Sequence, residues 1–534
     1  MRHVLASLTL VLAVSAPAAD YQFMAALPTK NQHTARAFLW IPPTCATVRG
    51  IIYGRQVILE KLVLDDPIIR NAAQDNDLAI VLTKDTDSTY TYSKDATGPA
   101  DIQALLDQLA ASSGYPEIVS APWLPIGHSG AAIGAWNMGY AKPERTFGIV
   151  GLHATGINRP DYDTKAKVTG IPILCINGEW EMWTGPERHL NHHVNWLRGV
   201  LLGMRGVQPE VLATALIQPG AGHFNWDARL AHHVADFIHA AADLRLPPKS
   251  SPTPAPLRNV PLESGWLSQA TRAEVSQFPP APFAAYTGDP FLAYWHPTGD
   301  LAKRTDAYAA MNVGRKPQML SFVENGKVLP ASWNVGIKPT FEADGETIRV
   351  QAAFLDRWPE KTLGAGMPLG HAATGTIHYQ LIGGWNGGGE QTGPDTFKVR
   401  PSCFGGPGGG LMLIASHDGD GQYGYTEMAG TLNVPDRFKE GTAQTIDFPQ
   451  PADVPAGAKD VTLSASATSG LEVSYTVIAG PAEVVGNRLT FTALPPKSPR
   501  PVTILVQAWQ RGRPIEPLVK TAEPVVRSFT WGGP

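Results

Sequence analysis

Short apolar runs alternate with helical patterns over the first half of the chain. The apolar runs are as long as buried β-strands, and they lie at residues 48–53, 78–82, 147–151, 171–176 and 211–217. The segments with helical periodicity lie at residues 100–113, 130–140, 186–203 and 226–244. Because strands that alternate with helices are typical of βαβ units, we predict an α/β fold with a doubly wound, mostly parallel sheet.

The second half of the chain is richer in glycine, aromatic residues and short alternating runs. A proline-rich linker at 247–256 separates it from the α/β domain, which we place at 19–246. Alternating runs predict a β-rich middle domain over residues 257–446, and they lie at 318–323, 347–354 and 375–382. Regularly spaced runs predict a small β-sandwich of the immunoglobulin-like type over 451–534, and they lie at 461–465, 471–478, 488–491 and 502–510.

Length, charge and the first residues narrow the class of protein. A chain of 534 residues with 43% hydrophobic content exceeds what one core normally supports. Its net charge of -4 offers no basic face for a polyanion, so nucleic acid is not an expected partner. Arg2 and His3, an apolar core at 4–14 and small residues up to Ala18 are typical of a signal peptide, 1–18, cleaved after Ala18. We therefore expect a secreted or periplasmic protein with no transmembrane segment.

The cysteine and histidine residues predict neither a metal nor a cofactor. The three cysteines are odd in number and far apart, so they imply no disulfide framework. His189, His192 and His193 share a predicted helix but lack the H-E-x-x-H pattern of a zinc site, which favours a solvated helix face.

The strongest chemical signal is a serine between glycines at the end of an apolar strand. The strand ends in Gly127-His128-Ser129-Gly130, and a helix of small residues follows. In a nucleophile elbow the residues two before and two after the serine must be very small, because strand and helix approach closely there. Gly127 meets this need, whereas Ala131 replaces the usual second glycine. The turn would expose Ser129 as a nucleophile and direct the Gly130 N–H, at the helix start, towards an oxyanion.

Acidic residues and a histidine follow the ends of two later strands. The run at 171–176 leads into Glu179 and Glu181, and the run at 211–217 leads into His223. The carboxyl ends of parallel strands share one edge of a sheet, and this edge is where open α/β sheets place their sites. The order serine, acid, histidine along the chain is the order found in α/β-hydrolases.

On these motifs, residues 36–245 resemble a secreted bacterial serine esterase of the α/β-hydrolase superfamily. The last segment resembles the Ig-like modules that are attached to secreted enzymes. The resemblance implies that Ser129 attacks an ester carbonyl, that His223 takes and returns the proton, and that an acidic residue orients the imidazole. The family commonly places its acid three residues after the glycine that ends the strand, which is Glu181 here, and Glu179 is the alternative.

The resemblance also implies a second oxyanion donor and a substrate surface. The family takes the second donor from the loop after an earlier strand. In this chain the run at 48–53 is followed by Gln56, whose backbone N–H is the predicted donor, with its side chain as an additional one. Trp180, Trp183 and Trp226 flank the acid and the base. They are predicted to stack on a sugar ring or an aromatic acyl group, although aromatic residues near a sheet edge also complete cores.

Together these features favour a serine hydrolase that acts on carboxylic esters without a cofactor. Export, aromatic residues near the site and an appended β module suit the acyl esters of a polysaccharide, such as acetyl or feruloyl groups. A serine peptidase or a polyester depolymerase would keep the same residues and change the bond. A non-catalytic carbohydrate-binding or adhesion protein that has lost the chemistry is the third hypothesis. The acyl group, the alcohol and the oligomeric state stay open.

Overall fold

The computed structural model describes most of the chain. The described residues are 20–29, 33–86, 98–154, 168–181, 192–250, 255–269, 276–360, 362, 364–383, 388–405 and 409–533, with the backbone alone at 192–198 and 200. The predicted signal peptide, 1–18, and part of the proline-rich linker lie outside these residues.

An eight-stranded sheet forms the first half of the chain, in the order β1-β2-β4-β3-β5-β6-β7-β8. Its strands are β1 (Phe23–Pro28), β2 (Thr34–Trp40), β3 (Gly50–Arg55), β4 (Leu78–Lys84), β5 (Trp123–His128), β6 (Ile149–Leu152), β7 (Ile173–Gly178) and β8 (Ala213–Gln218). The pairs β1–β2 and β2–β4 are antiparallel, and all the other neighbours are parallel. The prediction of a mostly parallel sheet is confirmed, and the antiparallel edge at β1 and β2 adds to it.

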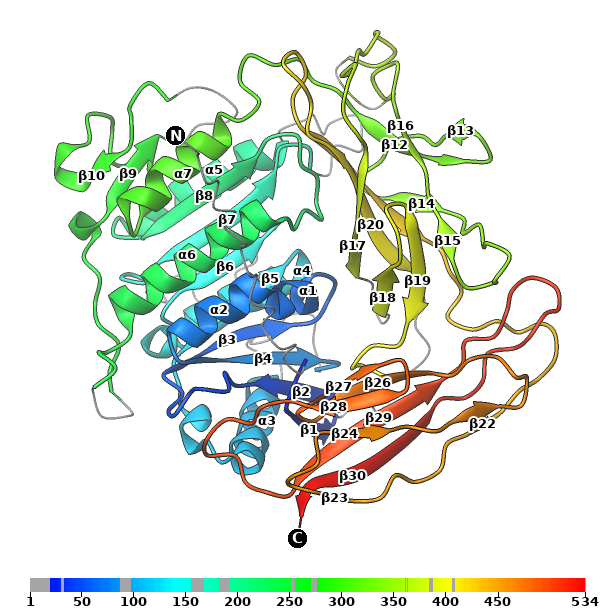
Figure 1. Cartoon of the computed structure of the whole chain (residues 1–534). Coiled ribbons are helices and arrows are strands. Elements are labelled where there is room, and N and C mark those ends of the chain that lie inside the picture. Colours follow the sequence, from blue (N-terminus) through cyan, green and yellow to red (C-terminus); the bar gives the residue numbers. More distant parts are fainter. Residues whose placement is uncertain are drawn as a thin grey trace, which may run out of the picture.

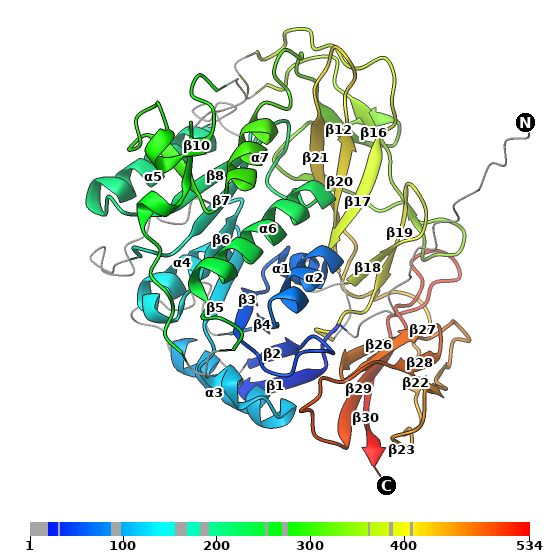
Figure 2. The same cartoon turned by 60° about the vertical axis from the view of Figure 1, so that its left-hand side comes forward.

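Helices cover both faces of this sheet (Figures 1 and 2). They are α1 (Glu60–Asp65), α2 (Pro67–Asp75), α3 (Gly98–Ser113), α4 (Gly130–Ala141), α5 (His192–Val207) and α6 (Ala228–Arg245). Helices α1, α2 and α6 share one core with side chains such as Ile52, whereas α3 packs on the opposite face with Ile51 and Tyr53. Successive side chains of a strand point to opposite faces, so strands covered on both sides read as continuous apolar runs.

The residues after the linker first extend the α/β half. Strands β9 (Trp266–Gln269), β10 (Ala281–Pro282) and β11 (Ala293–His296) form a small antiparallel sheet. Helix α7 (Gly299–Ala309) follows, and the Thr298 side chain accepts a hydrogen bond from the Leu301 N–H at its start. Both β11 and α7 lie against β8 (Figure 1).

Three small sheets then build the β-rich region that stands beside the main sheet (Figure 1). Their orders are β13-β12-β16, β14-β21-β20-β17 and β15-β19-β18. The strands are β12 (Leu320–Glu324), β13 (Lys327–Val328), β14 (Val335–Ile337), β15 (Ile348–Arg349), β16 (Ala352–Phe354), β17 (His378–Gly383), β18 (Gly388–Gln391), β19 (Thr396–Arg400), β20 (Leu411–His417) and β21 (Thr426–Leu432). Phe322, Phe397 and Leu413 belong to one shared core, so the three sheets pack as one unit.

The last part of the chain forms further β-sheets around a core that includes Leu489, Ile504 and Phe529. A four-stranded sheet has the order β23-β30-β29-β26, a three-stranded sheet has the order β24-β28-β27, and β22 pairs with β25. The strands are β22 (Ile446–Asp447), β23 (Val454–Pro455), β24 (Asp460–Thr462), β25 (Ser466–Ala467), β26 (Ser474–Ala479), β27 (Ala482–Val485), β28 (Arg488–Phe491), β29 (Val502–Trp509) and β30 (Val525–Gly533). The prediction of a β-rich second half is confirmed.

No helix within the described part of the chain combines the length and the apolar character needed to cross a membrane.

Candidate active site

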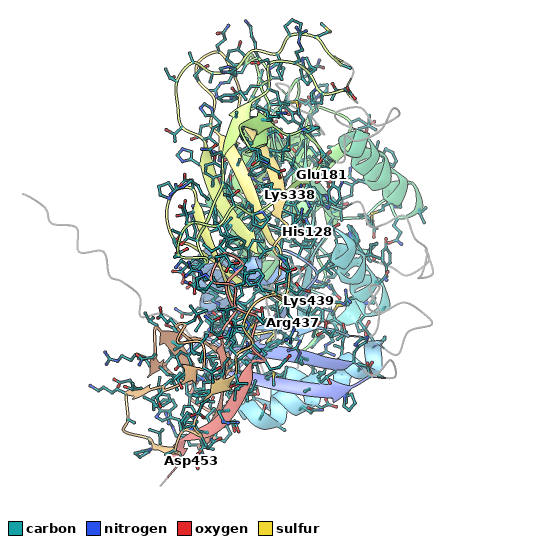
Figure 3. All side chains as sticks on the ribbon, turned by 90° about the vertical axis from the view of Figure 1, so that its right-hand side faces the viewer. His128, Glu181, Lys338, Arg437, Lys439 and Asp453 are labelled. Carbon is teal, nitrogen blue, oxygen red and sulfur yellow. The ribbon has the colours of Figure 1, made fainter. Side chains whose placement is uncertain are left out.

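Four neighbouring parallel strands of the main sheet end at one group of polar side chains. Ser129 follows β5, His153 follows β6, Glu181 comes three residues after β7, and His223 lies in the turn after β8. Because β5, β6, β7 and β8 are adjacent and parallel, their carboxyl ends meet at the same edge. Figure 3 shows Glu181 and the neighbouring His128 on the boundary between the main sheet and the β-rich region.

Ser129 occupies a strained turn between β5 and α4. Its φ of 52° and ψ of -119° lie outside the ordinary regions for a residue with a side chain. The Ser129 N–H donates to the Leu152 carbonyl at 2.9 Å, which fixes the turn to the end of β6. A Cβ on Gly127 would lie 2.5 Å from the carbonyl carbon and oxygen of Ala131, so only glycine fits there. This is the geometry of a nucleophile elbow.

The structure brings Ser129, His223 and Glu181 into one hydrogen-bonded row. The His223 Nε2 lies 2.9 Å from the Ser129 Oγ, and the His223 Nδ1 lies 3.4 Å from the Glu181 Oε2. Glu179, the alternative acid, instead accepts the Gly220 N–H on its Oε2 at 2.9 Å. Of the two acids, Glu181 is therefore the one that contacts His223.

Glu181 is almost completely buried, at 1% exposure, and accepts hydrogen bonds on both oxygens. The His153 Nδ1 and the Gly178 N–H approach its Oε1 at 2.7 and 2.9 Å, and the Asn177 Nδ2 approaches its Oε2 at 3.1 Å. Burial alone would raise the pKa of this carboxyl, but the hydrogen bonds and charges of His153 and His223 outweigh burial and hold the pKa well below its usual value. Glu181 is therefore ionised at neutral pH.

Two further histidines surround His223 and were missed as site residues in the sequence. His153 bridges Glu181 to the Asn225 carbonyl, which its Nε2 reaches at 3.1 Å. The His128 Nε2 donates to the His223 carbonyl at 2.8 Å. Burial lowers the pKa of His128 well below its usual value, and His223 and His153 lower it further, so this imidazole is neutral. A usable signal existed for His153, because it follows the apolar run at 147–151 at the same sheet edge.

Among the described residues, no group of three or more histidine, cysteine or acidic side chains is arranged to hold a metal ion.

The two predicted oxyanion donors, Gly130 and Gln56, differ in whether their backbone N–H groups already have a hydrogen-bond partner. Gly130 is the first residue of α4, where backbone N–H groups have no partner within the helix. The Gln56 N–H, by contrast, donates to the Thr83 carbonyl at 2.8 Å, and its side-chain Nε2 donates to the Ile58 carbonyl at 3.0 Å. The Gln56 backbone N–H and one N–H of its side-chain amide are thus already engaged, which corrects the prediction that the Gln56 backbone N–H faces an oxyanion.

A buried carboxylate that the sequence reading missed organises the loop after β3. The Glu60 Oε2 accepts the N–H groups of Val57 and Ile58 at 2.7 and 3.0 Å. Its Oε1 accepts the His128 N–H at 2.7 Å, one residue before Ser129. Burial raises the pKa of Glu60, although these hydrogen bonds oppose the rise. Glu60 therefore ties the loop after β3 to the nucleophile strand.

Trp180 and Trp226, which were predicted to contact a substrate, lie elsewhere in the structure. Trp180 packs into the core of the β-rich region, and Trp226 is buried in the main core with its Nε1 donating to the Asp66 carboxylate at 2.9 Å. Both complete cores and do not face a substrate, which corrects the prediction for these two residues. Trp183 lies outside the described residues.

Trp333, from the β-rich region, lies beside the candidate base. Its ring centroid is 5.7 Å from that of His223 and 5.5 Å from that of Phe224, on which it stacks at an interplanar angle of 24°. It keeps 39% of its surface exposed. The chain around it carries no motif that separates it from an ordinary surface tryptophan, so the sequence offered no signal for this contact.

Strand order, the antiparallel first strands and the elbow after β5 together define an α/β-hydrolase fold. No protein-family model matches the chain, and no curated protein sequence matches it either.

Several solved structures of hydrolases are similar to part of this chain. An S-formylglutathione hydrolase from Agrobacterium tumefaciens is 13% identical, and the match covers 41% of this chain and 94% of that chain with a TM-score of 0.30. An IroE-like serine hydrolase from Shewanella oneidensis is 12% identical over 42% and 80% of the two chains, with a TM-score of 0.30. A poly(3-hydroxybutyrate) depolymerase from Bordetella parapertussis is 13% identical over 43% and 93%, with a TM-score of 0.29. The fold assignment rests on the strand order and not on these likenesses.

Proposed function

We propose that this protein is a serine hydrolase of carboxylic esters that uses Ser129, His223 and Glu181 and forms an acyl-enzyme intermediate. The observation that carries the proposal is the row of contacts from the Ser129 Oγ through His223 to the Glu181 carboxylate. A half-buried serine at a strained strand-to-helix turn, with a base at 2.9 Å, is suited to nucleophilic attack. A binding protein without catalysis would not need this strain.

In the proposed reaction, the Ser129 Oγ attacks the ester carbonyl while the His223 Nε2 takes the serine proton. The imidazolium that forms keeps its Nδ1–H on ionised Glu181, which stabilises the new positive charge. His223 then returns the proton to the alcohol as the C–O bond breaks. A water molecule, deprotonated by the same imidazole, then attacks the acyl carbon. The bond from this carbon to the Ser129 Oγ breaks, the Oγ takes the proton from His223, and the acid is released.

The Gly130 N–H is proposed to stabilise the negative charge of the tetrahedral intermediate. It belongs to the first turn of α4, where the helix dipole adds to the hydrogen bond. One such donor typically lowers the barrier by about 3 kcal/mol.

We further propose that the substrates are acyl esters of polysaccharides, such as acetyl or feruloyl esters. Exposed Trp333, next to His223, offers a flat apolar surface on the side where the proton is returned to the leaving alcohol. Such a surface suits a sugar ring or an aromatic group.

Hydrolysis of a graded set of substrates tests the proposed function. The set contains p-nitrophenyl acetate, a feruloyl ester, an acetylated xylan and a peptide amide, each assayed with the wild type and with Ser129→Ala. We expect ester hydrolysis that is lost in the variant, with little cleavage of the amide. Cleavage of the amide with every ester spared would instead favour a peptidase.

Export and the nature of the last domain belong to the same proposal. We infer that residues 1–18 direct secretion and that residues 451–534 form an Ig-like module. The sheets around the shared core of this last part support the second inference. Sequencing the N-terminus of the exported protein should find Ala19 as the first residue.

A further inference from the structure

The turn that carries His223 lies against the free edge of a strand from the β-rich region. The partner strand β14 pairs with β21 only from Gly430 onwards. Before that point the Glu427 N–H of β21 donates to the Gly220 carbonyl at 3.1 Å. The turn that carries His223, called the histidine turn below, therefore takes the place of β14 beside this part of β21. At the other end of the turn, the Gln380 Nε2 of β17 donates to the Trp226 carbonyl at 2.7 Å. Strands from the second half of the chain thus fix the turn at both ends.

The approach of the two segments is close enough to restrict the residue at the start of the turn. Gly220 has a φ of +73°, and a Cβ there would lie 2.0 Å from the Tyr425 carbonyl oxygen. Only glycine allows this conformation beside β21.

The side chain of Glu427 holds the turn on both sides of His223. Its Oε1 accepts the Gly222 N–H at 2.8 Å, and its Oε2 accepts the Asn225 Nδ2 at 2.6 Å. The Tyr425 hydroxyl donates to the same Oε2 at 2.7 Å. Burial raises the pKa of Glu427, which is 3% exposed, while the three donors oppose that rise. A buried carboxylate whose oxygens are all matched by donors orders the groups that surround it.

A continuous row of buried contacts links Glu427 to the acid of the proposed triad. Asn225, held by Glu427 through its side chain, accepts the His153 Nε2 on its carbonyl at 3.1 Å. His153 in turn contacts the Glu181 Oε1 at 2.7 Å. Glu181 thus contacts the ring of His223, and Glu427 contacts the backbone and side chain that flank His223 in the turn, which His128 and Glu179 also contact from the main sheet.

We propose that Glu427 is a positioning residue for His223, so that the β-rich half of the chain supplies part of the active site. This inference rests on the proposed function. It predicts that the main sheet and its helices hold the nucleophile and the acid, whereas the base needs β21 to be held within reach of Ser129. A displacement of about 1 Å between reacting groups can lower a rate about a hundredfold.

The test compares three variants of the full-length protein with p-nitrophenyl acetate as substrate. Glu427→Met keeps the shape of the side chain and removes both acceptors. Glu427→Gln keeps a carbonyl oxygen that accepts the Gly222 N–H. Its new NH2 group can donate to the Asn225 Oδ1 if the side-chain amides of Asn225 and Gln218 both rotate by half a turn. This rotation is open because the Gln218 Oε1 finds no hydrogen-bond partner among the described residues. The matched control is Gln318→Met, which removes buried hydrogen bonds to Gly424 and Ala372 in the same region without a bond to the histidine turn.

We expect kcat per folded molecule to fall about a hundredfold in Glu427→Met, with KM nearly unchanged, and to recover to within about tenfold of the wild type in Glu427→Gln. Gln318→Met should retain the wild-type kcat. In a His223→Ala background, Glu427→Met should cause no further loss, because there is no imidazole left to position. Circular dichroism of each variant gives the folded fraction.

A wild-type kcat in Glu427→Met, or an equal loss with and without His223, would overturn the positioning role while leaving the proposed function intact. If Glu427→Met does not fold, Glu427→Asp decides the question. It keeps the carboxyl group but is too short to reach both sides of the turn, so about a tenfold loss supports the role and an unchanged kcat refutes it. A folded wild type without esterase activity would overturn the proposed function, and the positioning role with it.

Discussion

Replacing Glu181 with glutamine separates the role of its charge from the role of its shape. The Glu181 Oε1 receives the His153 Nδ1 and the Gly178 N–H, so the glutamine carbonyl oxygen should take that side. The new amide NH2 then faces Asn177 and His223. Asn177 can rotate to present its Oδ1, which has no hydrogen-bond partner among the described residues. His223 can only respond by accepting on Nδ1, which moves its proton to Nε2 and leaves no base beside Ser129.

The magnitude follows from this change of tautomer. Loss of the acid's charge with intact geometry lowers kcat about 10⁴-fold in serine hydrolases of this mechanism, which is about 5 kcal/mol of activation free energy. The contact between the His223 Nδ1 and the Glu181 Oε2 is long, at 3.4 Å, so the pair is less tightly aligned before substrate binds. We therefore expect kcat to fall about 10³-fold to 10⁴-fold.

The assay is steady-state hydrolysis of p-nitrophenyl acetate, with Glu179→Gln as the matched control. Glu179 accepts the Gly220 N–H, and a glutamine can keep that bond through its carbonyl oxygen. Glu179→Gln should remain within about threefold of the wild-type kcat. The assignment of the acid would be refuted if Glu181→Gln stayed within about tenfold of the wild type, or if Glu179→Gln lost as much activity.

Three further predictions concern substrate binding, acid stability and the fit between the two turns. Trp333→Ala should raise KM for p-nitrophenyl acetate, whose leaving alcohol is aromatic, about fivefold to tenfold, because a stacking surface is lost, and leave KM for ethyl acetate unchanged; equal effects on both esters would argue against stacking. Burial lowers the pKa of His233 to about 3, and nearby Arg304 adds to this. The folded protein thus binds fewer protons at this site than the unfolded chain as pH falls from about 6.5 towards 3, and stability is lost through that window, by about 2 kcal/mol at pH 5. His233→Phe should make the loss of unfolding free energy between pH 7 and pH 5 smaller by this amount in urea titrations, and an unchanged loss would contradict it. Gly178→Ala should lower both kcat and the thermal midpoint, because its Cβ would lie 2.2 Å from the Gly222 carbonyl oxygen, whereas Gly199→Ala, whose Cβ would meet no described atom within 4 Å, should not.

The features of the site that could be predicted from the sequence are those that depend on residues close together along the chain. The turn at Ser129 is recognisable because the glycine before it and the small helix after it are local requirements. Glu181 and His223 are placed by the rule that parallel strands end at one edge, so their meeting could be anticipated although they are 42 positions apart. The choice between Glu181 and Glu179 could not, because it depends on which way each side chain leaves one short turn.

Contacts that depend on packing between distant segments left no signal in the sequence. Gln56 fails as an oxyanion donor because its backbone N–H pairs with the carbonyl of Thr83, which lies in the neighbouring strand β4. Trp180 leaves the substrate side because the core of the β-rich region takes it up. Trp333 and Glu427 approach His223 only because β21 and the loop before β14 fold against the main sheet, more than a hundred residues further along the chain. The sequence around Ser129 therefore predicts the turn that carries this serine, whereas the residues that surround His223 come from distant parts of the chain and are not predicted.

Covalent trapping of the nucleophile is the most direct test of the proposed mechanism. The protein is incubated with a fluorophosphonate, and the modified peptide is identified by mass spectrometry. We predict one adduct, on Ser129, that is absent in Ser129→Ala and forms much more slowly in His223→Ala. An adduct on another residue, no adduct at all, or the same rate without the imidazole of His223 would contradict the account.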